Sequence, residues 1–347
     1  MSTTKAYAAF DNKSPLRPFE VTRREPGPND IAIDILYCGI CHSDLHQIKN
    51  EWGNSTYPMV PGHEIVGRVT AVGANVKKLK VGELAGIGCM VDSCRKCGPC
   101  GRGLENYCQE GPTLTYNAVE RDGKTRTQGG YSKQYVCDES FVLKIGHEGS
   151  LEAVAPLLCA GITTYSPLRH WKVGKGMKVG VVGLGGLGHM AVKLAAAMGA
   201  EVTLFSSSAK KKDDAKRLGA HEYVVTSEGG DMAKHFGRLD FVLDTVSAQH
   251  DIASLLMTLR LDGTLCLVGA PEKPLQVPAY ALLFGRRSLA GSGIGGIAET
   301  QEMLDFCAQH EIVADVEMIA ADKINESLDR LAKSDVRYRF VIDNSTL

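Results

Sequence analysis

The chain has 347 residues, more than one hydrophobic core usually serves, so two domains of ordinary size are expected. Hydrophobic residues make up 44% of the sequence and charged residues 23%, values typical of a packed globular protein, which excludes a disordered or fibrous chain. Lysine and arginine total 39 against 40 aspartates and glutamates, so no net field favours a nucleic acid or an anionic membrane as partner.

The cellular compartment is inferred from the N-terminal residues and the cysteines. Residues 1–16 lack the apolar core of a secretory signal, and no uncharged apolar stretch reaches the about 18 residues of a membrane span. We therefore expect a cytoplasmic protein that takes a small-molecule substrate. In that reducing compartment, its eleven cysteines are expected to be metal ligands or buried thiols rather than disulfides.

The first region, from about Ile31 to Lys144, consists of short β-like runs broken by glycine. Examples are Ile31–Leu36 and Ile65–Val72. This spacing predicts a barrel or a sandwich.

Four cysteines of this region form the pattern Cys94-x2-Cys97-x2-Cys100-x7-Cys108. Four thiolates predict a closed tetrahedral zinc site, which is structural because no position is left for a substrate. An iron–sulfur cluster is one alternative, but bacterial ferredoxins use C-x2-C-x2-C-x3-C-P, and here the last interval is seven residues without a following proline. A nucleic-acid binder built on this loop is the other alternative, and the balanced charge disfavours it.

Beyond Leu151 apolar strands alternate with longer helical patterns, which indicates βαβ units and a parallel sheet. A boundary near residue 155 follows, with a first domain over residues 1–155 and a cofactor domain over residues 156–299. Residues about 300–347 are expected to return to the first domain, since Tyr338–Asp343 is again β-like. The predicted elements of the second region are the helix His189–Met198 and the strands Lys178–Val182, Glu201–Phe205, Tyr223–Val225, Phe241–Val246, Thr264–Val268 and Ser288–Ser292.

A glycine-rich turn separates the first of these strands from the helix and reads Gly183-Leu184-Gly185-Gly186-Leu187-Gly188. This G-x-G-x-x-G in a strand–turn–helix context predicts a dinucleotide site. The first glycine makes the tight turn, the second lets backbone amides approach a pyrophosphate, and the third lets the helix pack closely. The alternative is a glycine-rich connector without a ligand.

The next strand predicts which dinucleotide binds. Folds that choose NAD place Asp or Glu about 20 residues after the motif begins. Here the strand ends in Ser206-Ser207-Ser208, and Lys210, Lys211 and Lys212 follow. Hydroxyls and positive charge suit a 2′-phosphate that a carboxylate would repel, so NADP(H) is predicted. Alternatively the serines cap the next helix and the lysines are its solvated face, and both interpretations can hold together.

Three further metal-ligand types are dispersed: Cys41, His63 and Cys159. Singly, each is an ordinary polar residue or core thiol. Only their combination indicates a second metal site.

The sequence resembles the zinc-containing medium-chain dehydrogenases/reductases, and among them the cinnamyl alcohol dehydrogenase group. The family pattern G-H-E-x2-G-x5-G-x2-V is present in residues 62–76, and the resemblance covers essentially the whole chain, including residues 44–50, 57–64, 156–161 and 335–341. It implies an α/β two-domain fold, with a GroES-like β-barrel catalytic domain and a Rossmann cofactor domain built on a doubly wound parallel sheet. It also implies a homodimer paired through strands of the cofactor domains, although a tetramer is equally compatible.

The resemblance also implies roles for individual residues. Cys41, His63 and Cys159 would hold a catalytic zinc, with Glu64 as an occasional ligand or close neighbour and Asp44 orienting His63. Ser43 and His46 would form the proton relay. The remaining implied cofactor contacts are Thr163, Thr245, Gly269, Ser292, Gly293 and Ile294 on the nicotinamide side, and the three serines with Lys211 at the 2′-phosphate.

Two positions depart from the lignin-forming members of that group. Those members usually have Trp where this chain has Leu114, and often an aliphatic residue where this chain has Trp52. Both positions belong to the implied substrate pocket, so the resemblance does not imply a strict cinnamyl specificity.

The expected activity is that of an NADP-dependent alcohol dehydrogenase/aldehyde reductase with two zinc ions per chain. Zinc polarises an aromatic or medium-chain aldehyde while NADPH supplies hydride. One alternative is an NAD-dependent zinc dehydrogenase of polyols or simple alcohols. The other is a non-catalytic zinc and nucleotide binding protein, such as a redox sensor or a lens-type structural protein.

Overall fold

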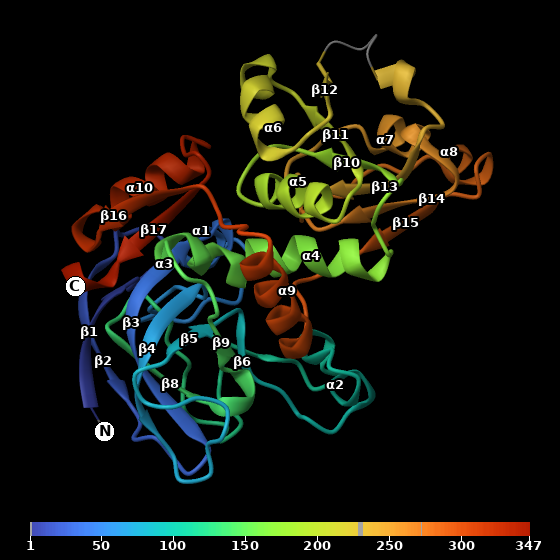
Figure 1. Ribbon diagram of the computed structural model, residues 1–347. Helices are drawn as coiled ribbons and strands as arrows, with labels where there is room; N and C mark the ends of the chain where they lie inside the picture. The colour runs from blue at the N-terminus through green and yellow to red at the C-terminus, as the bar shows by residue number, and fades with distance from the viewer. Residues whose placement is uncertain (1, 228–231, 272) are drawn as a thin grey trace. The chain divides into compact units, whose positions relative to one another are not determined.

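The computed structural model describes residues 2–227, 232–271 and 273–347 (Figure 1). The chain forms two compact units, one of Met1–Cys159 with Gly295–Leu347 and the other of Ala160–Ile294. Within the described ranges, no helix is both long and apolar enough to cross a membrane.

The first unit is dominated by a seven-stranded mixed sheet with β3 at its centre. The sheet runs β16-β17-β3-β4-β5-β9, and β8 also pairs with β3. Two small sheets, β1-β2 and β6-β7, complete the strands. The strands are β1 (Ser2–Ala8), β2 (Arg17–Arg23), β3 (Asp30–Ile40), β4 (Ile65–Val72), β5 (Leu84–Ile87), β6 (Met90–Asp92), β7 (Thr113–Leu114), β8 (Gln134–Asp138), β9 (Leu143–Lys144), β16 (Val316–Ala320) and β17 (Arg339–Asp343).

The C-terminal segment is part of this same sheet. Strand β17 pairs antiparallel with β3, with Phe340 opposite Ile40, so a strand from the red part of the chain lies beside a blue one in Figure 1. Helix α10 buries Ile324, Leu328 and Leu331, whose i, i+4, i+7 spacing gives one apolar face. The helices of the unit are α1 (His42–Ile48), α2 (Gly98–Gly101), α3 (Leu151–Val154), α9 (Ile297–Gln309) and α10 (Ile324–Ala332).

The second unit is a six-stranded, fully parallel sheet in the order β12-β11-β10-β13-β14-β15. Strand β10, near the middle of this sheet, is buried from its second residue to its last, as expected for a parallel strand covered on both faces. The elements are α4 (Ala160–His170), β10 (Lys178–Val182), α5 (Gly188–Ala197), β11 (Glu201–Ser206), α6 (Lys212–Leu218), β12 (Glu222–Val225), β13 (Leu239–Asp244), α7 (Ile252–Thr258), β14 (Leu259–Leu267), α8 (Ala279–Leu283) and β15 (Ser288–Gly291).

The two sheets agree with the predicted fold class, while several predicted element ends are displaced. Strand β13 begins two residues earlier than predicted and β14 five residues earlier, and α5 begins at Gly188 rather than His189. Strands β1 and β2 precede the region in which strands were predicted. Buried apolar residues identify the middle of an element well, but its ends depend on backbone hydrogen bonding, which the pattern of side chains does not report.

The turn between β10 and α5 requires two glycines for different reasons. Gly183 has φ +88°, a left-handed conformation that side chains disfavour. At Gly188 a Cβ atom would lie 2.0 Å from the carbonyl oxygen of Gly183, so only glycine lets the helix approach the strand this closely. At Gly185, by contrast, a Cβ atom would have no neighbour within 4 Å.

We therefore expect Gly188→Ala to destabilise the second unit and Gly185→Ala to leave its stability nearly unchanged. The alanine at position 188 overlaps backbone that cannot rotate away, and overpacking of this kind costs about 1–3 kcal/mol. Urea unfolding of both variants without cofactor is the measurement. Equal stability of the two variants would contradict the close packing.

Candidate functional site

A single buried carboxylate organises the first site. Asp44 lies in the first turn of α1, and its Oδ2 accepts hydrogen bonds from the backbone N–H of Cys41 at 2.9 Å and the hydroxyl of Tyr131 at 3.2 Å. Its Oδ1 accepts the N–H of Gly62 at 3.2 Å and contacts Nδ1 of His63 at 3.0 Å. The helix start and the loop before β4 are therefore joined at one point.

Next to this carboxylate, the structure brings together Cys41, His63, Glu64 and Cys159, whose ligand atoms all lie within 4.8 Å of one another. All four side chains are buried. The sulfurs of Cys41 and Cys159 are 3.9 Å apart, and two thiolates bound to one tetrahedral zinc would be separated by about 3.8 Å. Since Nδ1 of His63 contacts Asp44, Nε2 is the nitrogen left for a metal. The residues present therefore fit a zinc ion.

The electrostatics of this cluster also suit a cation. The Cys41–Cys159 hydrogen bond lowers the pKa of Cys41 and raises the pKa of Cys159, because the two sulfurs share a proton. Burial opposes a charged His63, but Asp44 together with the sulfurs of Cys89 and Cys41 outweighs it and raises the pKa of that imidazole. A dication bound by these atoms would take the place of the protons that the isolated cluster retains.

Glu64 is held by a partner that was not predicted from the sequence. Its Oε1 pairs with the guanidinium of Arg339 in β17, and both side chains are buried. Burial raises the pKa of Glu64 to about 7 against the pull of this arginine. Oε2 of Glu64 has no hydrogen-bond partner and lies where a Cβ on Gly39 would stand, 1.9 Å away. The charge of Arg339 directly before the buried run Phe340–Ile342 was the available signal for this residue.

The residues of the implied proton relay lie along α1. The hydroxyl oxygen of Ser43 is 3.7 Å from the sulfur of Cys41. His46, one turn further, contacts the carboxylate of Glu51 through Nδ1, and its ring lies 5.5 Å from the ring of Trp52. Glu51 was not among the partners predicted for His46, although it lies only five residues away.

The two predicted substrate-pocket residues are both exposed. Trp52 is 52% exposed and Leu114, in β7, is 41% exposed. Two residues after Leu114, the ring of Tyr116 stacks on His63 with a centroid distance of 5.8 Å. Leu114 is therefore only two residues away from a ring that contacts the cluster of Cys41, His63, Glu64 and Cys159.

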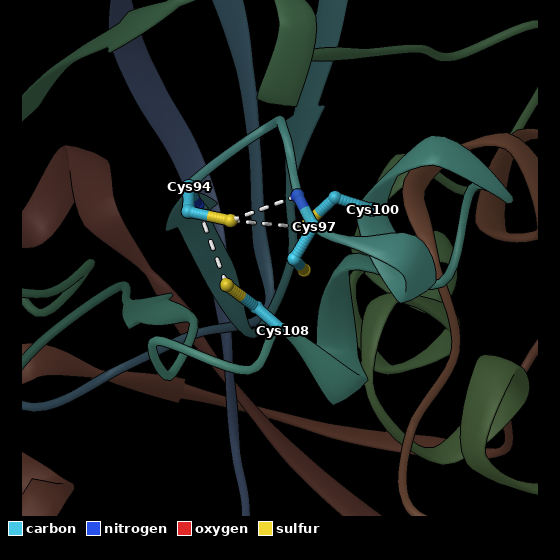
Figure 2. Close-up of side chains that lie close together, drawn as sticks. All are labelled: Cys94, Cys97, Cys100 and Cys108. Carbon is cyan, nitrogen blue, oxygen red and sulfur yellow. Dashed lines mark hydrogen bonds between the residues drawn. The ribbon is translucent and has the colours of Figure 1, made fainter.

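The four-cysteine loop forms a second cluster (Figure 2). The ligand atoms of Cys94, Cys97, Cys100 and Cys108 all lie within 4.8 Å of one another, and the sulfurs of Cys94 and Cys100 are 3.9 Å apart. Backbone N–H groups of Cys94 and Cys97 donate to sulfurs of the cluster at 3.4 Å, an arrangement that stabilises thiolates. Four protein ligands close this site against a substrate.

In the second unit, the predicted cofactor residues gather at one edge of the sheet. Parallel strands present their carboxyl ends on the same edge, where nucleotides bind. Thr163 is the exception, because it is a buried residue of helix α4 and does not lie at the end of a strand. The positions at the strand ends are Gly183 after β10, Ser206 at the end of β11, Thr245 after β13, Gly269 after β14 and Ser292 after β15, followed by Gly293 and Ile294.

The serine and lysine segment contacts the glycine-rich turn. Nζ of Lys211 donates to the carbonyl oxygen of Leu184 at 2.8 Å. The hydroxyl of Ser208 accepts the N–H of Lys210 at 3.2 Å, so the helix-capping alternative holds for this serine. The hydroxyl of Ser206 accepts the N–H of Ser208 at 3.4 Å, and Ser207 is exposed. No carboxylate stands at the end of β11.

Comparisons with known proteins identify the family. The chain matches the alcohol dehydrogenase GroES-like domain over residues 27–147 and the zinc-binding dehydrogenase domain over residues 186–309. It is 58% identical to the aldehyde reductase YahK of Escherichia coli over 99% of both chains. Among solved structures, it is similar to a cinnamyl alcohol dehydrogenase of Sorghum bicolor, with 47% identity, coverage of 99% of this chain and 98% of that one, and a TM-score of 0.96.

A second solved structure, the CAD of Helicobacter pylori complexed with NADP(H), is 42% identical and covers 99% of this chain and 98% of that one, with a TM-score of 0.92. These matches confirm the fold class and the resemblance inferred from the sequence. The chain belongs to the zinc-containing medium-chain dehydrogenase/reductase family, within its cinnamyl alcohol dehydrogenase group.

Proposed function

We propose that the protein is a zinc-dependent alcohol dehydrogenase/aldehyde reductase that transfers hydride between NADPH and the carbonyl carbon of an aldehyde. The observation that carries this proposal is the buried cluster of Cys41, His63 and Cys159, three ligands from distant parts of the chain that fit one zinc. Two thiolates and an imidazole form an open zinc site, in which a fourth position remains for a substrate. The names of the relatives support the same reaction class.

A bound zinc would act as a Lewis acid toward a carbonyl oxygen. Residues of the chain would supply and remove the proton at the substrate oxygen. The hydroxyl of Ser43, which lies 3.7 Å from the sulfur of Cys41, would hold a proton at the substrate oxygen. His46 is partly exposed and would exchange that proton with water, while Glu51 orients the imidazole through Nδ1 and leaves Nε2 for the exchange.

Trp52 and Leu114 would contribute to the substrate pocket. Trp52 packs beside His46, and Leu114 stands close in sequence to the Tyr116 that stacks on His63. Exposed apolar side chains at such positions favour an aromatic or medium-chain aliphatic aldehyde over a polyol. This supports broad rather than strictly cinnamyl specificity.

We expect turnover to depend on Cys159. An NADPH-oxidation screen over aromatic, branched and linear aldehydes should show activity in a protein that contains two zinc ions per chain. Cys159→Ser should lose turnover and retain one zinc, because serine is a poor zinc ligand and the four-cysteine site is untouched. Cys137→Ser, a buried cysteine outside both clusters, is the matched control and should remain active. Undiminished turnover of Cys159→Ser would rule out the catalytic-zinc assignment.

The proposed cofactor is NADP(H), with Ser206, Ser207, Ser208 and Lys211 at the 2′-phosphate. The support is the lysine held against the glycine-rich turn and the bound NADP(H) in the Helicobacter pylori relative. Thr163, Thr245, Gly269 and the segment 292–294 would receive the nicotinamide half.

Lys211→Ala should raise the KM for NADPH about tenfold and leave the KM for NADH unchanged, since one charge-assisted hydrogen bond is lost only from the phosphorylated cofactor. Lys210→Ala, at the neighbouring exposed position, is the control and should behave as the wild type. Steady-state kinetics with both cofactors provide the test. A wild type that prefers NADH would instead favour the alternative of an NAD-dependent polyol dehydrogenase.

We further propose that the protein is a cytoplasmic homodimer. The six cysteines of the two clusters must remain reduced to bind metal, which favours the cytoplasm. Strand β15 is an edge strand, and exposed apolar side chains lie close to it in sequence, with Leu283 74% and Phe284 86% exposed. An exposed edge strand next to such residues is suited to pairing with a second copy.

Phe284→Asp should convert this dimer into a monomer, because a charge would be buried at the interface without a partner. Light scattering coupled to size-exclusion chromatography measures the mass directly. Val81→Asp, which alters an exposed apolar residue of the first unit, is the control and should stay dimeric. A monomeric wild type would contradict the proposal.

A further inference from the structure

The loop of the four-cysteine cluster is in contact with the segment at which the chain re-enters the first unit. Helix α9 begins at Ile297, directly after the crossover at Ile294 and Gly295. Its N-cap, Gly296, has no side chain that could bind the free N–H groups of the first turn. Glu105, which lies between the third and fourth cysteine, takes this role: its Oε2 accepts the N–H of Ile297 at 3.0 Å.

The contact at Gly296 is also sterically tight. A Cβ atom there would lie 1.8 Å from the carbonyl oxygen of Gly103 and 2.8 Å from Oε2 of Glu105. The residue must therefore be glycine for the helix start to reach the loop. The carboxylate and the close backbone contact together fix the position of this helix end.

The two loop residues are themselves fixed by the cysteine cluster. The N–H of Gly103 donates to the carbonyl of Cys100 at 3.0 Å, and the N–H of Cys108 donates to the carbonyl of Glu105 at 3.0 Å. Metal binding by Cys100 and Cys108 would hold the backbone on both sides of Gly103 and Glu105. The position of the α9 start is thus coupled to the metal cluster through short backbone links.

On the other side of the crossover, the chain carries backbone strain. Ile294 has φ +45°, a conformation that is unfavourable for a β-branched residue and persists only where neighbouring contacts impose it. Before it, the N–H of Ser292 donates to the carbonyl of Leu267 at 3.0 Å. After it, the Gly103 and Glu105 contacts hold Gly296 and Ile297. These two attachments bracket the strained residue.

We propose that Glu105 is a positioning residue for cofactor binding: by anchoring Gly296 and Ile297 to the four-cysteine loop, it holds the segment Ser292–Ile294 in its NADPH-binding conformation. The role rests on the proposed function, since it assumes that this segment contacts the nicotinamide half of NADPH. In this proposal the four-cysteine site has a second role besides stability, because a metal bound there supports the conformation of the segment Ser292–Ile294.

The test is a comparison of Glu105→Ala, Glu105→Gln and Glu110→Ala. Glu110 lies in the same loop, is exposed and pairs with Lys96 and Arg121, so its removal is the matched control. Glu105→Ala should weaken NADPH binding about tenfold through loss of a charge-assisted hydrogen bond, with kcat and the aldehyde KM nearly unchanged. Glu105→Gln should restore part of the affinity, because the amide oxygen still accepts the Ile297 N–H. Glu110→Ala should bind NADPH as the wild type does.

The measurements are the dissociation constant of NADPH, steady-state kinetics, zinc content and the unfolding temperature of each variant. If the role of Glu105 were purely structural, Glu105→Ala would lower the unfolding temperature, and NADPH affinity and kcat would change together. In the proposed role, NADPH affinity falls while kcat stays nearly unchanged. If Glu105→Ala does not fold, Glu105→Gln tests the same contact by itself, because the amide keeps the side-chain volume and one acceptor, and it should weaken NADPH binding by less than tenfold.

NADPH affinity within twofold of the wild type in the folded variants, at full zinc content, would overturn the proposal. A wild type that binds no NADPH would instead refute the proposed function, so the two failures are distinguishable.

Discussion

The buried carboxylate of Asp44 is the interaction on which the first site depends. It accepts hydrogen bonds from the start of α1 and from the loop before β4, and it contacts the imidazole of His63. A buried carboxylate is costly unless it is fully hydrogen-bonded, so these groups stay in place around it. The consequence is that Cys41 and His63, which belong to different segments, are held close enough to bind one metal ion.

The two clusters use the same chemistry for different ends. The four-cysteine cluster is assembled from one short loop and closed by thiolates alone, whereas the other combines two thiolates with an imidazole, next to a carboxylate that is paired with Arg339. The closed cluster also anchors the start of α9 through Glu105. The four-cysteine loop thus helps to fix the position of the start of α9, in addition to being stabilised by its own metal ligands.

Much of the architecture follows from local pattern. The buried β-branched run of β10, the glycines that follow it and the helix after them specify a strand–turn–helix unit without information from the rest of the chain. The four-cysteine spacing is local in the same sense. Contacts between residues far apart in the sequence could not be predicted from local pattern. Arg339 is 275 residues from its partner Glu64, and Glu105 is 192 residues from its partner Ile297.

The sequence by itself determined the fold class, the glycine-rich turn and the identity of the ligand types, because each is encoded by residues within one element or by recognisable family patterns. The resemblance implied that Cys41 and Cys159 meet, and the structure gives their sulfurs a separation of 3.9 Å. Only the tertiary structure decided the Glu64–Arg339 pair and the contact of Glu105 with α9. The physical reason is that such contacts join segments far apart in the chain, as when the pairing of β17 with β3 brings Arg339 into the first site, and no local periodicity records that pairing.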